Sequence, residues 1–400
     1  MLKTPKGNRL HIGIFGRRNV GKSALLNALT RQTVSIVSEI AGTTTDPVEK
    51  PMEMLPIGPV LFIDTAGIDD EGFLGAKRIA RTRQIFDRVD IGILVAEAST
   101  WSRYERELVA EFKKRQVPVI VAFNKSDLYE PAAELLNELN GEHIPAIRTI
   151  ATQGRGAVEL RAALIDLLPE DFLRPPGILD GLVKTGETIV LVVPIDKEAP
   201  KGRIILPQVQ TIRAALDSNA QCVVVTEFQL SAALRNLQKP PVLVVTDSQV
   251  FAKVAADTPP EIPMTSFSIL FARQKGDLQA FIGGARTIAA LKPGDAVLIA
   301  EACTHHPIAD DIGTEKIPRW LNHLVGGELH FEHAQGHDFP EDLPRYQLVI
   351  QCGSCMQNRR EVLTRIARCQ SASVPITNYG LAIAYAHGIL ERAIAPFRMM

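Results

Sequence analysis

The chain has 400 residues, of which 46% are hydrophobic and 22% are charged, a balance typical of globular proteins. Four hundred residues exceed what one hydrophobic core normally holds, so two to three domains are expected. The formal net charge of −1 at pH 7 excludes the global basic field that draws many proteins to nucleic acid.

The sequence also indicates a compartment. The opening residues lack the apolar core of a signal peptide, and no apolar run is long enough to span a bilayer. A cytoplasmic, reducing setting is therefore expected, with neither a membrane nor a nucleic acid as partner. In that setting the five cysteines are expected to be free thiols or ligands rather than disulfides.

The first predicted elements are a strand, a glycine-rich turn and an apolar helix, written HIGIFGRRNVGKSALLNALT. The spacing Gly16-x-x-x-x-Gly21-Lys22-Ser23 fits a phosphate-binding loop, whose backbone N–H groups and helix N-terminus attract phosphates. Lys22 would reach the β- and γ-phosphates, and the Ser23 hydroxyl would bind Mg²⁺. Nucleotide contacts are expected from Gly16, Asn19, Val20, Gly21, Lys22, Ser23 and Ala24.

Two later strands carry further parts of a nucleotide site. The strand in VLFIDTAG ends in Asp64 and Gly67, whose carboxylate can hold the Mg²⁺ shell and whose N–H can meet the γ-phosphate. The strand in VIVAFNKSD delivers Asn124, Lys125 and Asp127 to a loop. A carboxylate there can accept hydrogen bonds from the N1–H and the amine of guanine, a donor pair that adenine lacks.

Further along, IATQGRG is similar to the fifth loop of such proteins, with the backbone of Ala151 near the guanine. Four motifs in this order predict a GTP-binding domain over residues 8–170. This part resembles the Era/TrmE-like branch of GTPases, as GRRNVGKS, AGTTTD, DTAG and NKSD indicate. The resemblance implies that Thr44 senses the γ-phosphate and Mg²⁺, with Thr43 as the alternative. The residues expected to act in hydrolysis are Lys22, Thr44, Asp64 and Gly67.

A potassium ion is a further expectation. Ile68 stands where Ras-like enzymes place a glutamine that orients water, and an aliphatic side chain cannot do so. In TrmE-like proteins a potassium ion held partly by an asparagine of the phosphate loop takes that role. Asn19 occupies the matching position, with an ordinary loop residue as the less favoured alternative.

The middle of the chain carries no chemical motif. Two prolines and a glycine in DFLRPPG, Asp171 to Gly177, predict a boundary. The apolar runs TIVLVVPI, AQCVVVTE and PPVLVVTDS then alternate with helical patterns. This periodicity predicts a small, mostly parallel sheet over residues 178–260, with helices on both faces. We expect a packing or dimerisation domain, hence a homodimer, with Cys222 as a core residue.

The remaining part, residues 263–400, contains two apolar strands that each end at cysteine. DAVLIAEACTHHP ends at Cys303 and His305, and YQLVIQCGSC ends at Cys352 and Cys355 before a helix. If the two strands are parallel in one sheet, the three cysteines emerge at its C-terminal edge, where such sheets bind ligands. The positive end of the following helix would favour thiolates. Cys369 lies further along that helix and is expected to pack.

Three kinds of site use a Cys-x-x-Cys pair. A thioredoxin-like redox couple would leave Cys303 idle and lacks its usual aromatic and proline neighbours. A four-ligand zinc site stays open because six of the nine histidines lie between His305 and His337, although there is no second Cys-x-x-Cys. Three cysteines also suit a [4Fe–4S] cluster whose fourth iron takes another ligand. The spacing alone leaves zinc and the cluster both open.

The order of these motifs resembles the HydF family of [FeFe]-hydrogenase maturation GTPases, and the likeness covers the whole chain. It rests on Cys303-x-His305 followed, after about fifty residues, by Cys352-x-x-Cys355. The resemblance implies a [4Fe–4S] cluster on the three cysteines and a role as scaffold and carrier of a di-iron precursor. Radical-SAM maturases would act upstream, and apo-[FeFe]-hydrogenase would be the acceptor.

One position departs from the family pattern. Gln351 stands where the family usually has histidine, and an amide is a poor iron ligand beside imidazole. The fourth position is therefore left to His305, His306, water or the incoming precursor.

The predicted fold is α/β throughout, with a P-loop GTPase domain, a small dimerisation domain and a cluster-binding domain. Two rival functions stay open. A TrmE/Era-like GTPase of RNA modification or ribosome assembly, with a structural metal, would be expected to carry a basic RNA-binding module, and none is visible. A GTP-regulated zinc protein is the second. The sequence does not indicate which step GTP hydrolysis drives.

Overall fold

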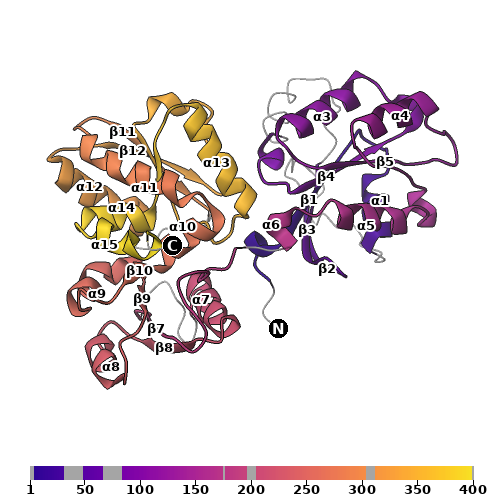
Figure 1. The fold of residues 1–400 in the computed structure, drawn as a ribbon. Coiled ribbons are helices and arrows are strands. Elements are labelled where there is room, and N and C mark those ends of the chain that lie inside the picture. Colours follow the sequence, from indigo (N-terminus) through magenta and orange to yellow (C-terminus); the bar gives the residue numbers. More distant parts are fainter. Residues whose placement is uncertain are drawn as a thin grey trace. The chain divides into compact units, whose positions relative to one another are not determined.

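The chain divides into two compact units, Met1–Pro175 and Pro176–Met400 (Figure 1). The division falls inside the DFLRPPG segment. The computed structural model describes residues 4–30, 48–65, 83–173, 176–195, 204–302 and 311–398.

The first unit contains a six-stranded sheet in the order β2-β3-β1-β4-β5-β6. Only β2 runs antiparallel to its neighbour, whereas the other strands pair in parallel. The strands are β1 (Leu10–Phe15), β2 (Val48–Met54), β3 (Gly58–Asp64), β4 (Ile91–Ala96), β5 (Val119–Phe123) and β6 (Ala146–Arg148). The described helices are α1 (Lys22–Thr30), α3 (Arg103–Lys114), α4 (Ala133–Gly141), α5 (Ala157–Asp166) and α6 (Glu170–Leu173).

Apolar clusters cover both faces of this sheet. Leu25 of α1 and Leu160 of α5 belong to one cluster, and Phe112 of α3 and Leu139 of α4 belong to the other. Every residue of β1, β4 and β5 is buried, as expected for parallel strands with helices on both sides. The carboxyl ends of these strands carry the loops of the candidate nucleotide site.

The middle of the chain forms the parallel four-stranded sheet β10-β9-β7-β8. Its elements are β7 (Thr188–Val192), α7 (Leu206–Asp217), β8 (Gln221–Val225), α8 (Leu230–Asn236), β9 (Leu243–Thr246), α9 (Phe251–Asp257), β10 (Met264–Ser266) and α10 (Phe267–Lys275). The edge strand β10 lies beyond residue 260, where the sequence pattern placed the end of this domain. Three residues that run directly into a helix are too few to show a strand periodicity.

The C-terminal part forms a second parallel sheet in the order β12-β11-β13-β14. Its elements are α11 (Leu278–Arg286), β11 (Ala296–Glu301), α12 (Ile317–Val325), β12 (His330–Gln335), β13 (Leu348–Gln351), α13 (Arg359–Ser371), β14 (Ile376–Asn378), α14 (Tyr379–Ala386) and α15 (Leu390–Ile394). The two strands predicted to end at cysteines, β11 and β13, are parallel neighbours, with Ala300 opposite Gln351. Their carboxyl ends therefore meet at one edge of the sheet.

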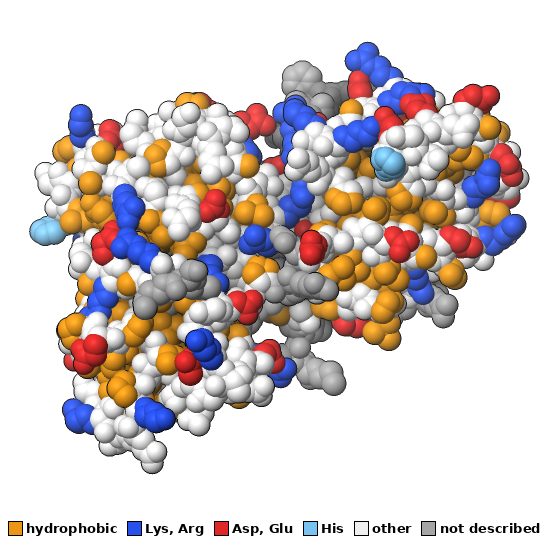
Figure 2. Space-filling view, viewed as in Figure 1, with side chains coloured by type: hydrophobic (Ala, Val, Ile, Leu, Met, Phe, Trp, Pro, Cys, Tyr) orange, Lys and Arg blue, Asp and Glu red, His pale blue; other side chains and the backbone are white. Residues whose placement is uncertain are grey.

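Short helical turns complete the described elements. The 3-10 segments are η1 (Lys6–Asn8), η2 (Ala98–Thr100), η3 (Ala151–Gln153), η4 (Ser248–Val250), η5 (Thr287–Ala290), η7 (Leu343–Arg345) and η8 (Ala395–Phe397), and η6 (Ile312–Lys316) is a π-helical turn. Acidic and basic side chains are both spread over the face shown in Figure 2. Within the described ranges, every helix falls short of the length and apolar character that a bilayer crossing requires.

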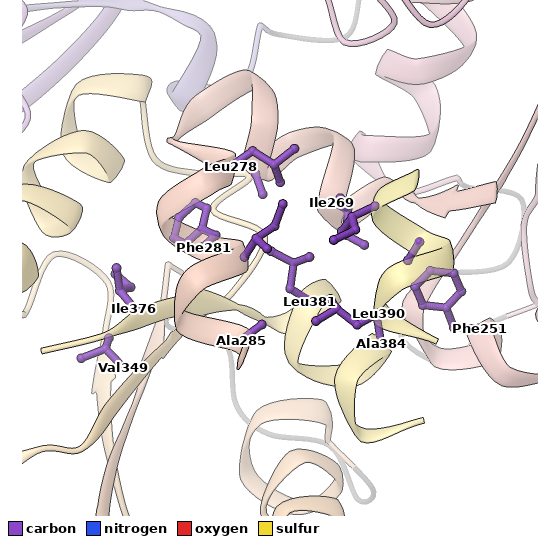
Figure 3. Packing of buried hydrophobic residues seen from close by; sticks show 14 of the residues in the cluster. Phe251, Ile269, Leu278, Phe281, Ala285, Val349, Ile376, Leu381, Ala384 and Leu390 are labelled. Carbon is purple, nitrogen blue, oxygen red and sulfur yellow. The ribbon is translucent and has the colours of Figure 1, made fainter. Parts of the chain in front are cut away.

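One hydrophobic core joins the two sheets of the second unit (Figure 3). Ile269 of α10, Phe281 of α11 and Leu381 of α14 belong to the same cluster as Val190 of β7 and Val349 of β13. All five side chains are at most 1% exposed. The middle and C-terminal sheets therefore share one buried cluster, although each sheet also has a cluster of its own.

The shared core predicts that the two sheets unfold together. Replacing Phe281 by alanine should lower the free energy of unfolding of the second unit by about 3–5 kcal/mol, because it removes a buried ring and leaves a cavity. Hydrogen exchange in increasing urea, read on peptides from β7 and from β13, should show both losing protection at the same lower urea concentration.

Phe228→Ala is the matched control for this experiment. Its ring is 77% exposed, so the variant should stay within about 0.5 kcal/mol of the parent protein. A Phe281→Ala protein in which only β13 loses protection would show that the two sheets are independent.

Candidate nucleotide site and candidate metal centre

The glycine-rich turn between β1 and α1 adopts a conformation that requires its glycines. Gly16 and Gly21 have φ angles of 135° and 96°, a region that disfavours side chains. A Cβ on Gly21 would lie 2.2 Å from Asn124 Nδ2, and one on Gly16 would lie 2.1 Å from the carbonyl oxygen of Val95. Asn19 lies on the same turn, is exposed, and has a φ of 63°, which asparagine tolerates.

Lys22 is the first residue of α1 and its ammonium lies over the turn. Nζ donates to the carbonyl oxygens of Gly16 at 2.6 Å and of Arg17 at 2.7 Å, and the side chain is buried. The lysine therefore holds its charge where the motif predicts phosphate. Val20 is buried on the same turn, and Ala24 packs against the core beside it.

Ser23 and Asp64 come together as the motifs predict. Ser23 Oγ donates to Asp64 Oδ2 at 3.4 Å, and Asp64 is the last residue of β3. Asp64 Oδ1 is buried without a hydrogen-bond partner among the described residues. Burial raises the pKa of this carboxyl, and the nearby Lys22 and Ser23 oppose the rise. A buried carboxylate oxygen that lacks a partner, beside a hydroxyl, fits a Mg²⁺ ion.

Asn124 connects two loops of the candidate site. Its Nδ2 donates to the carbonyl oxygen of Val20 at 2.8 Å, and its Oδ1 accepts from the backbone N–H of Ala151 at 3.0 Å. Thr149 Oγ1 also donates to Oδ1, at 3.2 Å. Because each end of the amide meets a group of the right kind, its orientation is defined. Asn124 thus links the phosphate loop to the loop that contains Ala151, here called the base loop because guanine is predicted to bind there.

Lys125 and Asp127 of the NKSD motif are more open to a ligand than Asn124 is. Lys125 has a φ of 57°, and its Nζ donates to Glu97 Oε1 at 2.5 Å. Asp127 is exposed on the loop after β5, so its carboxylate is accessible to a base.

The sequence reasoning missed the role of Arg17 in this loop. Arg17 Nε donates to Glu105 Oε1 at 2.6 Å, and its guanidinium lies 4.6 Å from the ring centroid of Tyr104. Glu105 is 1% exposed and also accepts from the backbone N–H of Ser102 at 2.9 Å, which caps α3. Arg17 therefore fixes the phosphate loop to the start of α3.

Several predicted residues lie outside the described part of the chain. They are Thr43, Thr44, Gly67, Ile68, Cys303, His305 and His306.

Cys352 and Cys355 lie on the loop between β13 and α13, and Cys352 Sγ is a hydrogen-bond acceptor. It accepts from the backbone N–H of Ala302 at 3.1 Å and of Ser354 at 3.4 Å. Burial raises the pKa of the Cys352 thiol, the neighbouring Cys355 adds to the rise, and the two N–H donors oppose it. Since Ala302 directly precedes Cys303, the chain passes from a contact with Cys352 to the third predicted cysteine.

Lys275, the last residue of α10, contacts the same loop and was not singled out by any sequence motif. Its Nζ donates to the carbonyl oxygens of Ser354 at 2.9 Å, Cys355 at 3.3 Å and Gln357 at 2.8 Å. The side chain is 5% exposed, and burial lowers the pKa of Lys275 to about 8, with the two cysteines and Glu361 opposing the decrease.

Gln351, which departs from the family pattern, is buried and forms a hydrogen bond to the cysteine loop. It is 1% exposed, and its Nε2 donates to Ser354 Oγ at 2.6 Å. Ser354 Oγ in turn donates to the carbonyl oxygen of Cys352 at 3.2 Å, and Ser354 has a φ of 52°. Gln351 Oε1 is buried and has no partner within the described ranges.

Two buried polar groups flank this loop. Tyr379 donates to Glu301 Oε1 at 3.0 Å, and burial raises the Tyr379 pKa well above its usual value, with Cys352 and Glu301 adding to the rise. On α13, Glu361 Oε1 accepts from Gln357 Nε2 at 2.8 Å and lies 3.0 Å from His337 Nδ1. His337 thus has a carboxylate partner.

The described residues contain no group of three or more His, Cys, Asp and Glu side chains placed to hold a metal. The third cysteine of the predicted set, Cys303, is outside them. Cys222 is half-buried and Cys369 is fully buried, and burial raises their pKa values to about 11 and about 12. The described loop offers two neighbouring thiols, N–H donors to sulfur and a buried cation, and this set fits a thiolate-bound, anionic group.

Comparison with protein families divides the chain into three matched parts. Residues 11–125 match the 50S ribosome-binding GTPase family. Residues 178–276 match the hydrogen maturase F dimerization domain, and residues 279–396 match the hydrogen maturase F tetramerization domain.

Two curated relatives match less than half of this chain. GTPase Der of Kosmotoga olearia is 34% identical over 190 residues, which are 44% of this chain and 43% of Der. The tRNA modification GTPase MnmE of Chromobacterium violaceum is 35% identical over 160 residues, 40% of this chain and 35% of MnmE. The chain thus spans less than half the length of these relatives. The crystal structure of the G domain of the T. maritima FeoB iron transporter shares 25% identity, with a TM-score of 0.33, over 40% of this chain and 98% of that one.

The first matched part belongs to a GTPase family, whereas the two parts that follow it match domains of hydrogen maturase F. Both hydrogen maturase F domains are present in succession after a GTPase domain with an assembled phosphate loop. The chain therefore belongs to the hydrogen maturase F (HydF) family.

Proposed function

We propose that this chain is a GTPase that also carries a [4Fe–4S] cluster, receives a di-iron precursor of the [FeFe]-hydrogenase active site and delivers it to the apo-hydrogenase. The observation that carries the proposal is the parallel pairing of β11 with β13 in a HydF chain, because it brings the segments that lead to the cysteines to one sheet edge. Radical-SAM maturases are the proposed donors of the precursor.

In the nucleotide site, the chain's own residues bind and orient the GTP. Lys22 neutralises charge on the β- and γ-phosphates, while Ser23 and Asp64, with Thr44, hold Mg²⁺. The backbone N–H of Gly67 meets the γ-phosphate. Mg²⁺, when bound, supplies positive charge where negative charge develops on the transferred phosphoryl group. Asp127, Lys125 and the backbone of Ala151 select guanine, and Asn124 keeps their loop against the phosphate loop.

We also propose a K⁺ ion at Asn19. Its exposed position on the phosphate loop leaves the side-chain oxygen accessible to a cation beside the phosphates. Ile68 cannot orient a water molecule, so a cation is the simplest source of the remaining positive charge.

In the proposed metal centre, Cys303, Cys352 and Cys355 supply three thiolates. The N–H groups of Ala302 and Ser354 stabilise charge on the Cys352 sulfur. The cluster, when bound, would have a fourth iron without a cysteine ligand, and His305 or an incoming precursor would bind that iron.

The edge strand β8 is the surface we propose for self-association, which the dimerization and tetramerization domains support. In the described chain β8 pairs only with β7, so its other side presents unpaired backbone groups. Val224 on β8 is 45% exposed and Leu216 on α7 is 58% exposed. An apolar, open edge accepts another strand readily, and a second copy of the chain offers a matching one.

The rival function in RNA modification or ribosome assembly is not favoured. It rests on the GTPase part alone, while both later domains match hydrogen maturase F. Acidic and basic side chains are both present over the face shown in Figure 2, and a phosphate backbone would favour a basic one.

The K⁺ proposal predicts a salt-specific rate of GTP hydrolysis. Phosphate release should be several-fold faster in KCl than in NaCl at equal ionic strength, and Asn19→Ala should remove the difference. Asn140→Ala, at an exposed position on α4, should retain it. Equal rates in the two salts for the parent protein would require a catalytic group from the protein instead.

The cluster proposal predicts which cysteines hold iron. After anaerobic reconstitution, Cys303→Ala, Cys352→Ala and Cys355→Ala should each lose the four-iron EPR signal, because two thiolates are too few to retain the cluster. Their GTP hydrolysis should be unchanged. Cys222→Ala and Cys369→Ala should keep the signal, since both thiols pack in the fold.

A stable cluster in Cys303→Ala would contradict the proposed site. Stoichiometric zinc in place of iron, in protein prepared without added metal, would favour the zinc alternative.

The self-association proposal predicts that a charge on the open edge separates the copies. Val224→Lys should raise the dimer dissociation constant at least about tenfold, because pairing would bury two like charges. Sedimentation velocity over a concentration series measures this. Val158→Lys, at a 66% exposed position on α5 of the first unit, is the control and should leave the constant unchanged. An unchanged constant in Val224→Lys would exclude β8 as the interface.

A further inference from the structure

Lys275 is a buried cation whose described hydrogen bonds all go to one short loop. The three protons of its ammonium meet three carbonyl oxygens, those of Ser354, Cys355 and Gln357, at 2.8 to 3.3 Å. An ammonium has three donors, so its hydrogen-bonding capacity is fully used. The three carbonyls belong to a segment of four residues, and a single side chain therefore fixes the course of that segment.

The charges that face Lys275 are those of the candidate metal centre. Cys355, Cys352 and Glu361 are the acidic side chains whose charged forms interact with it. Carbonyl dipoles solvate an ammonium in part, but a buried cation also requires an anionic neighbour to offset the loss of water. Glu361 has partners of its own, since its Oε1 accepts from Gln357 and from the buried guanidinium of Arg365 and lies beside His337. Thiolates, or a group bound by them, are the anions left to balance Lys275.

Hydrogen bonds between the cysteine-loop region and α10 have donors on both sides. While Lys275 donates to carbonyls of the loop, Arg359 at the start of α13 donates from Nη1 to the carbonyl oxygen of Gln274, at 2.6 Å. At its other end, α10 is capped by Ser266 of β10, whose Oγ accepts from the backbone N–H of Ile269 at 3.3 Å. One helix thus runs from the sheet of the dimerization domain to the cysteine loop of the tetramerization domain.

We propose that Lys275 is the positioning residue of the cysteine loop and the counter-charge of the group that its thiolates bind. It acts through the backbone of Ser354, Cys355 and Gln357 and is not itself a ligand. This inference rests on the proposed [4Fe–4S] function for its electrostatic part. Its positioning part concerns the metal-free chain and stands without the cluster.

Two readouts separate these parts, and Lys275→Met is the main variant. In metal-free protein, hydrogen exchange of the peptide covering residues 352–358 should be at least several-fold faster in Lys275→Met, because the loop loses three hydrogen bonds. In reconstituted protein, an EPR-monitored redox titration should give a midpoint potential more negative than that of the parent. The reduced cluster carries one more negative charge and has lost the nearby cation that stabilises it.

Matched variants assign each effect. Lys253→Met removes the same charge from an exposed position on α9 and should change neither readout. Lys275→Gln keeps N–H donors but removes the charge, so it should shift the potential as Lys275→Met does while accelerating exchange less. Lys275→Arg keeps the positive charge, so its midpoint potential should lie closer to that of the parent than the potentials of the other two variants do.

The outcomes are distinguishable. Parent-like exchange in Lys275→Met overturns the positioning role, and a parent-like potential in Lys275→Gln overturns the counter-charge. If the parent protein binds no iron under reconstitution, the proposed function fails, and exchange in the metal-free protein still decides whether Lys275 positions the loop.

Discussion

The parallel pairing of β11 with β13 is the constraint on which the candidate metal centre depends. The backbone hydrogen bond from Cys352 to Ala300, at 2.9 Å, extends the ladder one residue beyond the end of β13. The next contact, from the N–H of Ala302 to Cys352 Sγ, links positions 50 residues apart in sequence. Without this register, the segment leading to Cys303 and the Cys-x-x-Cys loop would have no common location.

The loop beyond the strands is held by polar contacts, whereas the strands are held by the apolar core. Gln351, Ser354 and Lys275 are each at most 5% exposed, and their partners are mostly main-chain atoms of the loop itself. Buried polar groups in such networks specify one geometry more strictly than apolar contacts do. This division suits a site in which sulfur atoms must keep fixed positions whether or not a group is bound.

Much of the fold could be predicted because its strands are short, apolar and followed by glycine-rich or polar loops. The phosphate loop, the strand ending in Asp64 and the strands leading to the cysteines were all recognisable from local patterns. The edge strand β10 was not, since three residues show no periodicity. Lys275 was also missed, because a lysine that ends a helix looks like an ordinary surface residue and its partner Ser354 is 79 residues away. Likewise, nothing in the sequence indicated that the Gln351 side chain would form a hydrogen bond to Ser354.

The dual contact of Asn124 has a consequence for altering nucleotide specificity. One amide serves the phosphate loop through Val20 and the base loop through Ala151. A change at this position would disturb both loops at once, so its effects on base choice and on phosphate binding could not be separated. Asp127 is exposed and forms no hydrogen bond to another described residue, so a substitution there should leave the contacts between the described residues unchanged. Under the proposed function, redesign of base selection therefore begins at the carboxylate of Asp127 and leaves the amide of Asn124 in place.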